Sequence, residues 1–197
     1  MAIQKTVQQN TNGFALLLSI IISSIVLAIG VSLLHLSISQ INLASTARES
    51  EIAFQAAHAG ANCAWFWRYN TDTEDLFATA LSGSAAPTFS CFGDEEPSSA
   101  KHDQASVSGG TADTFDYEFP MGTAGSCTQV TVYVMRAGAA EMTWDLRSVN
   151  EGIGTNGIKK CDANGVCTII VSRGYNRNCA DIATSIFTIQ RELTVEF

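Results

Sequence analysis

The sequence predicts an α+β fold in which one long N-terminal helix, apolar at first and amphipathic afterwards, packs on a disulfide-bonded antiparallel β-sheet head. Three observations predict this fold. No Asp, Glu, Lys or Arg lies between Lys5 and Arg48. Beyond residue 110, apolar and polar residues alternate as they do in strands with one buried face. Six cysteines lie in the part of the chain that carries nearly all the charge.

The apolar segment, residues 14–36, has the length of a membrane-spanning helix. It contains no Asp, Glu, Lys or Arg, and a helix of this length is about 35 Å long, enough to cross the hydrocarbon core of a bilayer. Four serines and Gly30 interrupt the large apolar residues. Small residues of this kind let neighbouring helices approach closely.

The segment before the apolar run, residues 1–13, is short and polar. A secretory signal peptide is cut after its apolar run, at small residues. Residues 44–47 are the alternative place for such a cut, but the apolar run before them is longer than a signal-peptide core. The pair Gly13-Phe14 instead indicates a cut before the apolar segment, which then stays on the mature protein.

The helix is predicted to continue to about Arg68, with residues 37–68 as its amphipathic part. No Pro occurs before Pro87, and apolar or small residues recur every three to four positions through Ile52 and Cys63 to Phe66. An antiparallel sheet needs a cover over its apolar face, and this part of the helix is suited to provide it.

Three consecutive aromatic residues, Trp65, Phe66 and Trp67, end the predicted helix. We expect them in the core or at its edge. An aromatic binding platform is the alternative interpretation.

Residues 69–197 are predicted to form a β-rich head. Residues 71–75 can cap a short helix that runs through Phe77 to Leu81, and residues 82–110 are predicted to be a long connecting loop. Strand-like segments follow at 115–119, 130–135, 142–146 and 166–172. The last strand is predicted to place on one face Phe187, Ile189, Leu193, Val195 and Phe197, with Arg191 interrupting that face.

The cysteines are Cys63, Cys91, Cys127, Cys161, Cys167 and Cys179. An even number in a membrane-targeted chain predicts three disulfides in an oxidising compartment. Cys161 and Cys167 are the one pair that the sequence suggests, because Asn164-Gly165 between them is a hairpin-turn signal. A zinc site is the alternative, but no Cys-x-x-Cys pair and no His partner lies at zinc spacing.

Charge and motifs argue against nucleic-acid binding and against catalysis. The net charge is −8 and falls in the head, whereas a nucleic-acid surface needs clustered Lys and Arg. The histidines His35, His58 and His102 belong to no catalytic motif. Asn70-x-Asp72-x-Glu74 has the start of a calcium loop without its Gly and closing Glu, so a helix cap is preferred. We predict no enzyme activity, no cofactor and no metal.

The N-terminal residues resemble the type IV pilin and pseudopilin superfamily. The resemblance rests on the stretch Gly13-Phe14-Ala15-Leu16-Leu17-Leu18, on the uninterrupted apolar helix and on its amphipathic continuation. Residues 47–57 look like the helix continuation of the minor-pilin branch often called PilX-like. Residues 61–67, 172–176 and 191–193 are similar to uncharacterised pilin-like proteins of small-genome bacteria. The resemblance covers the first third of the chain well.

The resemblance implies processing and assembly. A prepilin peptidase would cut after Gly13 and methylate the new amine of Phe14. Phe14, Leu18 and Gly30 would then lie in a filament core formed with other pilin subunits, assembled at an inner-membrane platform from a single-pass precursor anchored in lipid. The family usually carries Glu at its fifth mature position, which is Leu18 here. Family members without this Glu are often located at the tip.

The predicted function is therefore that of a structural subunit, minor or at the tip, of a type IV pilus-like extracellular filament in adhesion, motility or DNA uptake. One alternative is a pseudopilin of a type II-like secretion system. Another is a membrane-tethered extracellular binding domain or enzyme that does not polymerise. Processing between Gly13 and Phe14 distinguishes the first two from the third.

Overall fold

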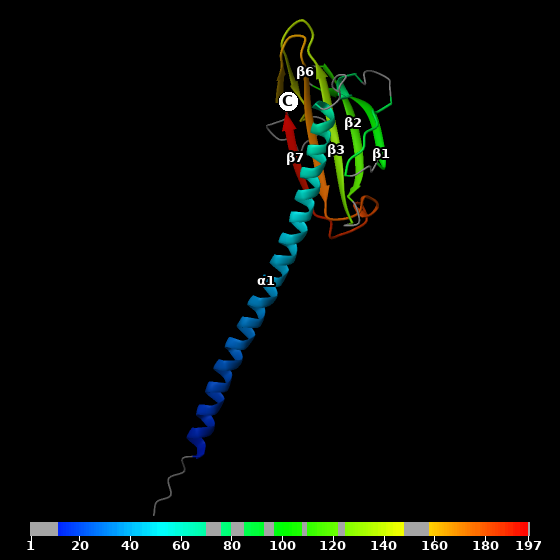
Figure 1. The fold of residues 1–197 in the computed structure, drawn as a ribbon. Helices are drawn as coiled ribbons and strands as arrows, with labels where there is room; N and C mark the ends of the chain where they lie inside the picture. Colours follow the sequence, from blue (N-terminus) through cyan, green and yellow to red (C-terminus); the bar gives the residue numbers. More distant parts are fainter. Residues whose placement is uncertain are drawn as a thin grey trace, which may run out of the picture. The chain divides into compact units, whose positions relative to one another are not determined.

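A computed structural model describes residues 12–69, 76–79, 85–92, 97–107, 110–121, 125–147 and 158–196. The chain divides into two compact units, Met1–Ala47 and Arg48–Phe197. The fold is α+β, as predicted (Figure 1). Its elements are α1 (Asn12–Tyr69), α2 (Leu76–Thr79), β1 (Ser99–Val107), β2 (Gly110–Met121), β3 (Ser126–Arg136), β4 (Met142–Asp145), β5 (Ile158–Cys161), β6 (Val166–Tyr175), the 3-10 helix η3 (Cys179–Asp181) and β7 (Gln190–Glu196).

The head is built on a five-stranded sheet with the order β1-β2-β3-β6-β7, in which every neighbouring pair is antiparallel. β4 and β5 form a separate two-stranded sheet. The alternation in the sequence predicted β2 and β3: Phe115, Tyr117 and Phe119 are buried, as are Val130 and the valines that follow it at every second position. Both strands therefore place their apolar residues on the face that the helix covers.

The part of α1 from Arg48 to Tyr69 packs on this face through its small residues. Ala53, Ala57 and Ala64 are buried. A Cβ atom added at Gly60 would meet Ser172 Oγ at 2.6 Å and Val130 Cγ2 at 2.9 Å. A Cβ at Gly174 of β6 would overlap the backbone of α1 at Ala53 and Ala57. The two glycines therefore permit a close approach of helix and sheet that larger residues would prevent.

This packing corrects the predicted placement of the aromatic residues of α1. Trp65 and Phe66 are 48% and 46% exposed, so neither is a core residue. Trp67 does pack against the core, and its Nε1 donates a hydrogen bond to the carbonyl oxygen of Ser90 at 2.8 Å. The physical reason is that alanine and glycine occupy the sheet-facing side of the helix, which turns most of its large side chains outward.

Two apolar clusters form on opposite faces of the five-stranded sheet. The cluster on the helix side is rich in aromatic rings, with Phe77 of α2 and Phe89 packed against Phe115 and Tyr117. The cluster on the outer face joins Tyr133, Met135 and Ile169 to Trp144 of β4 and Cys161 of β5. The small sheet therefore covers one end of the outer face and leaves the rest of that face to polar residues.

Two predictions about strands were wrong. Within the segment predicted to be a loop, residues 99–107 form β1, which pairs with β2 along its whole length. The sequence did not indicate β1 because neither side of the strand carries a row of large apolar residues. The side that faces the helix includes His102 and Gln104, and the other side includes Lys101 and Asp103. The last strand begins at Gln190, which leaves Phe187 outside it and 69% exposed, with Ile189 also outside it. Phe197 lies outside the described residues.

Three disulfides join Cys63 to Cys91, Cys127 to Cys179 and Cys161 to Cys167. The last pair is the one that the turn at Asn164-Gly165 suggested, and Asn164 has the positive φ of 58° that such a turn requires. Cys63 lies on α1, so its disulfide holds the head-packed part of the helix to the segment before β1. The residues predicted to cap the short helix, 71–75, lie outside the described part of the chain.

Candidate functional site

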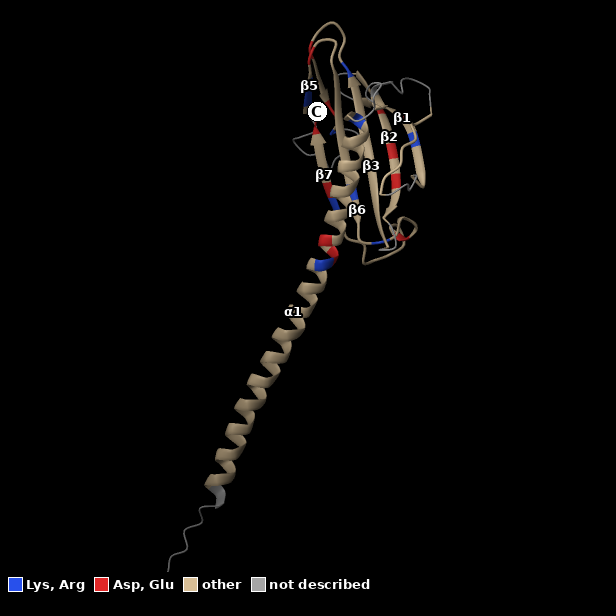
Figure 2. Cartoon of the chain, in the orientation of Figure 1, with Lys and Arg blue, Asp and Glu red and all other residues tan. Residues whose placement is uncertain are grey.

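The apolar part of α1, from Phe14 to Ala47, is the predicted site for membrane insertion and assembly. Its large side chains are exposed along its length, with Phe14 at 73% and Leu18 at 47%. In Figure 2 this part of α1 has no blue or red, because it contains no Lys, Arg, Asp or Glu. Among the described residues, α1 is the one helix long and apolar enough to cross a membrane. The chain thus has an N-terminal helix able to span a bilayer, followed by a soluble sheet domain.

Polar side chains in the apolar part bond to their own helix. Ser19 donates to the carbonyl oxygen of Leu16 at 2.8 Å, Ser24 to that of Ile21 at 2.8 Å, and Ser32 to that of Ala28 at 2.9 Å. Each hydroxyl therefore has an acceptor without the help of water. Serines satisfied in this way lower the cost of placing the helix in lipid or against other helices.

The residues predicted for processing and assembly lie on this one helix. Helix α1 begins at Asn12, so Gly13 and Phe14 lie in its first turn. Leu18 is about one turn beyond Phe14 and lies on a similar face. Gly30 is about 18 Å further along the axis, and a Cβ added there would meet no atom within 4 Å. The helix thus places Phe14 and Leu18 together and Gly30 apart from them.

The charged residues of α1 begin where the helix meets the head. Asn176, which is buried, donates a hydrogen bond to Oε2 of Glu49 at 2.7 Å and another to the carbonyl oxygen of Phe187 at 3.1 Å. Arg191 of β7 donates to Oγ of Ser50 through Nε at 2.8 Å and a terminal nitrogen at 2.6 Å. Arg191 was predicted to interrupt an apolar strand face, and its partner on the helix explains its place there.

The three histidines lie in separate surroundings. His35 is in the apolar part of α1, and His58 contacts Asn62 at 3.1 Å on the exposed side of the same helix. His102 of β1 lies 3.3 Å from a carboxylate oxygen of Asp113 and stacks on the ring of Phe115. The His102–Asp113 pair links β1 to β2, and an imidazole oriented by a carboxylate is one component of a general base.

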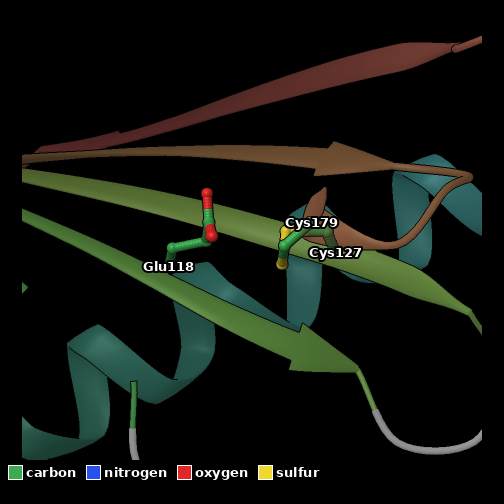
Figure 3. Close-up of side chains that lie close together, drawn as sticks. All are labelled: Glu118, Cys127 and Cys179. Atoms are coloured by element: carbon green, nitrogen blue, oxygen red, sulfur yellow. A yellow bond between two sulfur atoms is a disulfide. The ribbon is translucent and has the colours of Figure 1, made fainter. Parts of the chain in front are cut away.

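Glu118, Cys127 and Cys179 form a group of potential metal ligands among the described residues. Their ligand atoms lie within 4.8 Å of one another, and Figure 3 shows the carboxylate of Glu118 beside the two sulfur atoms. The sulfur atoms are joined as a disulfide. A metal binds the thiolate form of cysteine, so this oxidised arrangement does not fit a metal centre.

Tyrosine and aspartate pKa values shift in the head. Burial raises the pKa of Tyr117 far above its ordinary value of 10, and the neighbouring charge of Asp116 raises it further. The Tyr117 hydroxyl donates to the carbonyl oxygen of Pro87 at 3.0 Å. Hydrogen bonds from Arg147 lower the pKa of Asp145 to about 2. Neither group lies in a catalytic arrangement with His102 or another described histidine.

No protein-family model, curated protein or solved structure matches the chain. The family resemblance of the N-terminal residues therefore remains a prediction.

Two features of the site could be predicted only in part or not at all. The predicted helical period included small residues from Ala56-Ala57 and Ala59-Gly60-Ala61, but the sequence did not show that these residues, rather than the larger ones, face the sheet. The polar outer face of the sheet could not be predicted from any one stretch of the sequence. Its residues come from β1, β2, β3 and β6 and are brought together only by strand pairing.

Proposed function

We propose that this protein is a structural subunit, minor or at the tip, of a type IV pilin-like extracellular filament. The observation that carries the proposal is the exposed, uncharged part of α1, which precedes a head-packed part of the same helix. Membrane anchoring alone needs about 20 apolar residues. The uncharged run between Lys5 and Arg48 is about twice that length. This supports a role for the helix in addition to membrane anchoring.

The exposed side chains support helix–helix assembly. Burying one Leu, Ile or Phe side chain contributes about 1.5–3 kcal/mol, so a helix with this many exposed apolar residues is unfavourable in water. Lipid surrounds such a helix before assembly. Once the subunit leaves the membrane, the apolar parts of neighbouring subunits are the surroundings that keep these residues away from water.

Leu18 supports a minor or tip position. A carboxylate in an apolar filament core is costly unless it is paired, and family members use it to hold the N-terminal amine of a neighbour. Leu18 supplies no charge for such a pair. The proposed subunit therefore relies on apolar packing between helices. This suits the tip of a filament, where a subunit has a neighbour on one side along the filament axis and none on the other.

The head supports an extracytoplasmic location. Its described cysteines are all paired, and disulfides persist in oxidising compartments. The proposal thus places the head outside the cytoplasm, first on a membrane-anchored precursor and later on a filament. Its partners are other pilin subunits, a prepilin peptidase and an assembly platform in the inner membrane.

The N-terminus of the cell-surface protein tests the proposal. Intact-mass and N-terminal peptide measurements on protein sheared from cells are expected to give Phe14, with a methylated amine. Gly13→Leu blocks the cut and leaves a longer membrane-bound form, whereas the control Asn12→Ala is processed normally. A terminus at Met1, or at a cut near Ala47, contradicts the proposal and supports a tethered domain or a secreted one.

A further inference from the structure

The outer face of the head's five-stranded sheet carries a polar cleft on the side away from α1. Two adjoining cavities of about 230 and 480 Å³ form it, and both are lined by Asp116, Thr131 and Arg173. These residues alternate along β2, β3 and β6 with the buried residues that face the helix. The larger cavity falls within the range of about 300–1,000 Å³ that is common for small-molecule sites.

The cleft has walls on three sides. Strand β1 supplies one side through Lys101, Asp103 and Gln104. Tyr133 lies at one end of the cleft and belongs to the apolar cluster under the β4–β5 sheet. At the other end Glu118 lies beside the Cys127–Cys179 disulfide (Figure 3). The cleft is therefore built on paired strands and fixed at both ends.

Hydrogen bonds between neighbouring strands hold the lining side chains in place. Thr131 Oγ1 donates to Oδ1 of Asp116 at 2.6 Å, and Gln129 Nε2 donates to Oε2 of Glu118 at 2.9 Å. Arg173 Nε donates to Oε2 of Glu192, which is on β7, at 2.7 Å. Side chains positioned in this way lose little further freedom when a ligand binds.

Several polar groups in the cleft are available to form hydrogen bonds with a ligand. Among the residues that the structure describes, the second carboxylate oxygen of Asp116, the terminal nitrogens of Arg173 and the ammonium of Lys101 make no hydrogen bond. These groups include both acceptors and donors. A ligand that bridges them must itself both accept and donate hydrogen bonds.

Thr114 gives an independent sign of a ligand. It is only 8% exposed and lines the larger cavity, opposite Asp103 on one neighbouring strand and Tyr133 on the other. Its Oγ1 is buried and has no hydrogen-bond partner in the structure. Buried hydroxyls in native proteins nearly always have a partner, and a ligand in the cleft would supply one.

The charged groups in the cleft indicate which class of ligand it can bind. Lys101 and Arg173 share the cleft with Asp103, Asp116 and Glu118, and Arg173 is also paired with Glu192. A ligand in the cleft therefore meets groups of both signs. A strongly anionic ligand would meet the three carboxylates, and a cation would meet the two basic groups. An apolar ligand would leave these polar groups without partners. A neutral molecule rich in hydroxyl groups satisfies both the donors and the acceptors.

We propose that this cleft binds a neutral saccharide. Asp116 accepts hydrogen bonds from sugar hydroxyls, Arg173 and Lys101 donate to hydroxyl oxygens, and the hydroxyl of Thr114 bonds to the part of the sugar that enters the larger cavity. The proposal concerns the head alone and does not depend on assembly of the helix into a filament.

The test uses the full chain in a sugar-free polyoxyethylene detergent. The probes are glucose, galactose, mannose, N-acetylglucosamine, lactose and maltose, each at millimolar concentration, and binding is followed by saturation-transfer NMR. At least one of these sugars is expected to bind. Thr114→Val is expected to weaken that binding at least fivefold, and Asp116→Asn at least tenfold.

Thr168→Val is the matched control. Thr168 is also fully buried with a hydroxyl that has no partner, but it lies on β6 and on the helix-facing side of the sheet. The same substitution there is expected to leave sugar binding unchanged. Thermal unfolding of each variant shows whether the head remains folded, and Thr114→Val is expected to unfold at or above the temperature of the parent protein.

Three results would overturn the proposal. The first is that none of the six sugars binds. The second is that binding responds equally to Thr114→Val and Thr168→Val. The third is that inorganic phosphate or Ca²⁺, added as separate probes, binds in the cleft and displaces the sugar. Each of these results leaves the processing test at Gly13-Phe14 unaffected.

Discussion

Gly30 and Gly60 lie in the same helix, but their surroundings are opposite. A Cβ atom at Gly30 would meet nothing within 4 Å, whereas one at Gly60 would collide with Thr128, Val130 and Ser172. The same contrast holds for their neighbours. Large apolar residues around Gly30 are exposed, and alanines around Gly60 are buried. Helix α1 therefore has one part whose packing partner lies within the chain and one part whose partner does not.

The comparison teaches how to distinguish the two uses of an apolar helix. A part that packs on a sheet of its own chain must have side chains of the size that the gap allows, here alanine and glycine. A part that meets lipid or other helices keeps large apolar side chains all round. Each prediction below tests the head, or the part of α1 packed on it, against a region of the chain that is expected to respond differently.

The largest expected effect comes from the disulfide that the head-packed part carries. Removing it with Cys63→Ser and Cys91→Ser opens a loop with a sequence separation of 28 residues. On the loop-entropy account, this change lowers the free energy of unfolding of the head by about 3–4 kcal/mol. Urea unfolding in detergent, followed by near-ultraviolet circular dichroism, measures the loss.

The pair Cys161→Ser and Cys167→Ser is the control for that experiment. Its sequence separation is only 6 residues, so the expected loss is about 2 kcal/mol. Equal losses from the two pairs would show that the disulfide on α1 gives the head-packed part no special constraint.

The next effect comes from the same substitution at the two glycines. Gly60→Ala is expected to lower the free energy of unfolding of the head by about 1–3 kcal/mol, because its Cβ has no room against β3 and β6. Gly30→Ala is expected to leave the stability of the head unchanged, since the added methyl group meets no atom of the chain. A similar loss from both substitutions would contradict the comparison.

Alkaline pH is expected to destabilise the head and not the apolar part of α1, which contains no tyrosine. Burial raises the pKa of Tyr117 above 10. Below pH 10, Tyr117 is neutral in both the folded and the unfolded chain. Above pH 10 the unfolded chain loses the proton first, so stability falls by about 1.4 kcal/mol per pH unit for this group.

Tyr117→Phe tests this cause. The variant loses the hydrogen bond to Pro87 and is less stable at neutral pH, but its stability is expected to fall less steeply above pH 10. Urea unfolding between pH 8 and about pH 11 gives the slope. An unchanged slope would mean that other tyrosines, such as Tyr175, cause the alkaline loss.

The smallest effect is expected where the two parts of α1 meet. Arg191→Ala removes the hydrogen bonds to Ser50 and should cost no more than about 1 kcal/mol, because Arg191 is exposed and Ser50 is only partly buried. Hydrogen exchange of the amides of residues 49–52 is expected to speed up. Lys159→Ala, which removes a pair with Glu196 far from α1 in the sequence, should leave those amides unchanged.

Much of the fold could be predicted from the spacing of apolar residues and from the composition of the sequence. Phe115, Tyr117 and Phe119 predicted β2 because a strand buried on one face needs apolar residues at alternate positions. Strand β1 was missed because its edge position requires backbone pairing but few large apolar side chains. Phe66 was expected in the core or at its edge because large apolar side chains are usually buried, whereas the close approach at Gly60 and Gly174 admits only small residues.

The candidate sites differed in how far the sequence predicted them. The apolar helix is a local feature, so its residues could be identified directly. The saccharide cleft combines Lys101, Asp116, Thr131 and Arg173 from four strands, and its shape depends on strand order and register. No single segment of the sequence shows strand order or register, so the cleft could be identified only from the folded sheet.

Cross-linking at Leu27 tests most directly whether the exposed part of α1 packs against other subunits. A photoreactive amino acid replaces Leu27 in cells, the surface material is sheared off after irradiation, and mass spectrometry maps the cross-linked peptides. The account predicts cross-links from Leu27 to residues 14–47 of another pilin-like subunit. Cross-links to lipid alone, with none to a second subunit and no fibres in the sheared material, would contradict it.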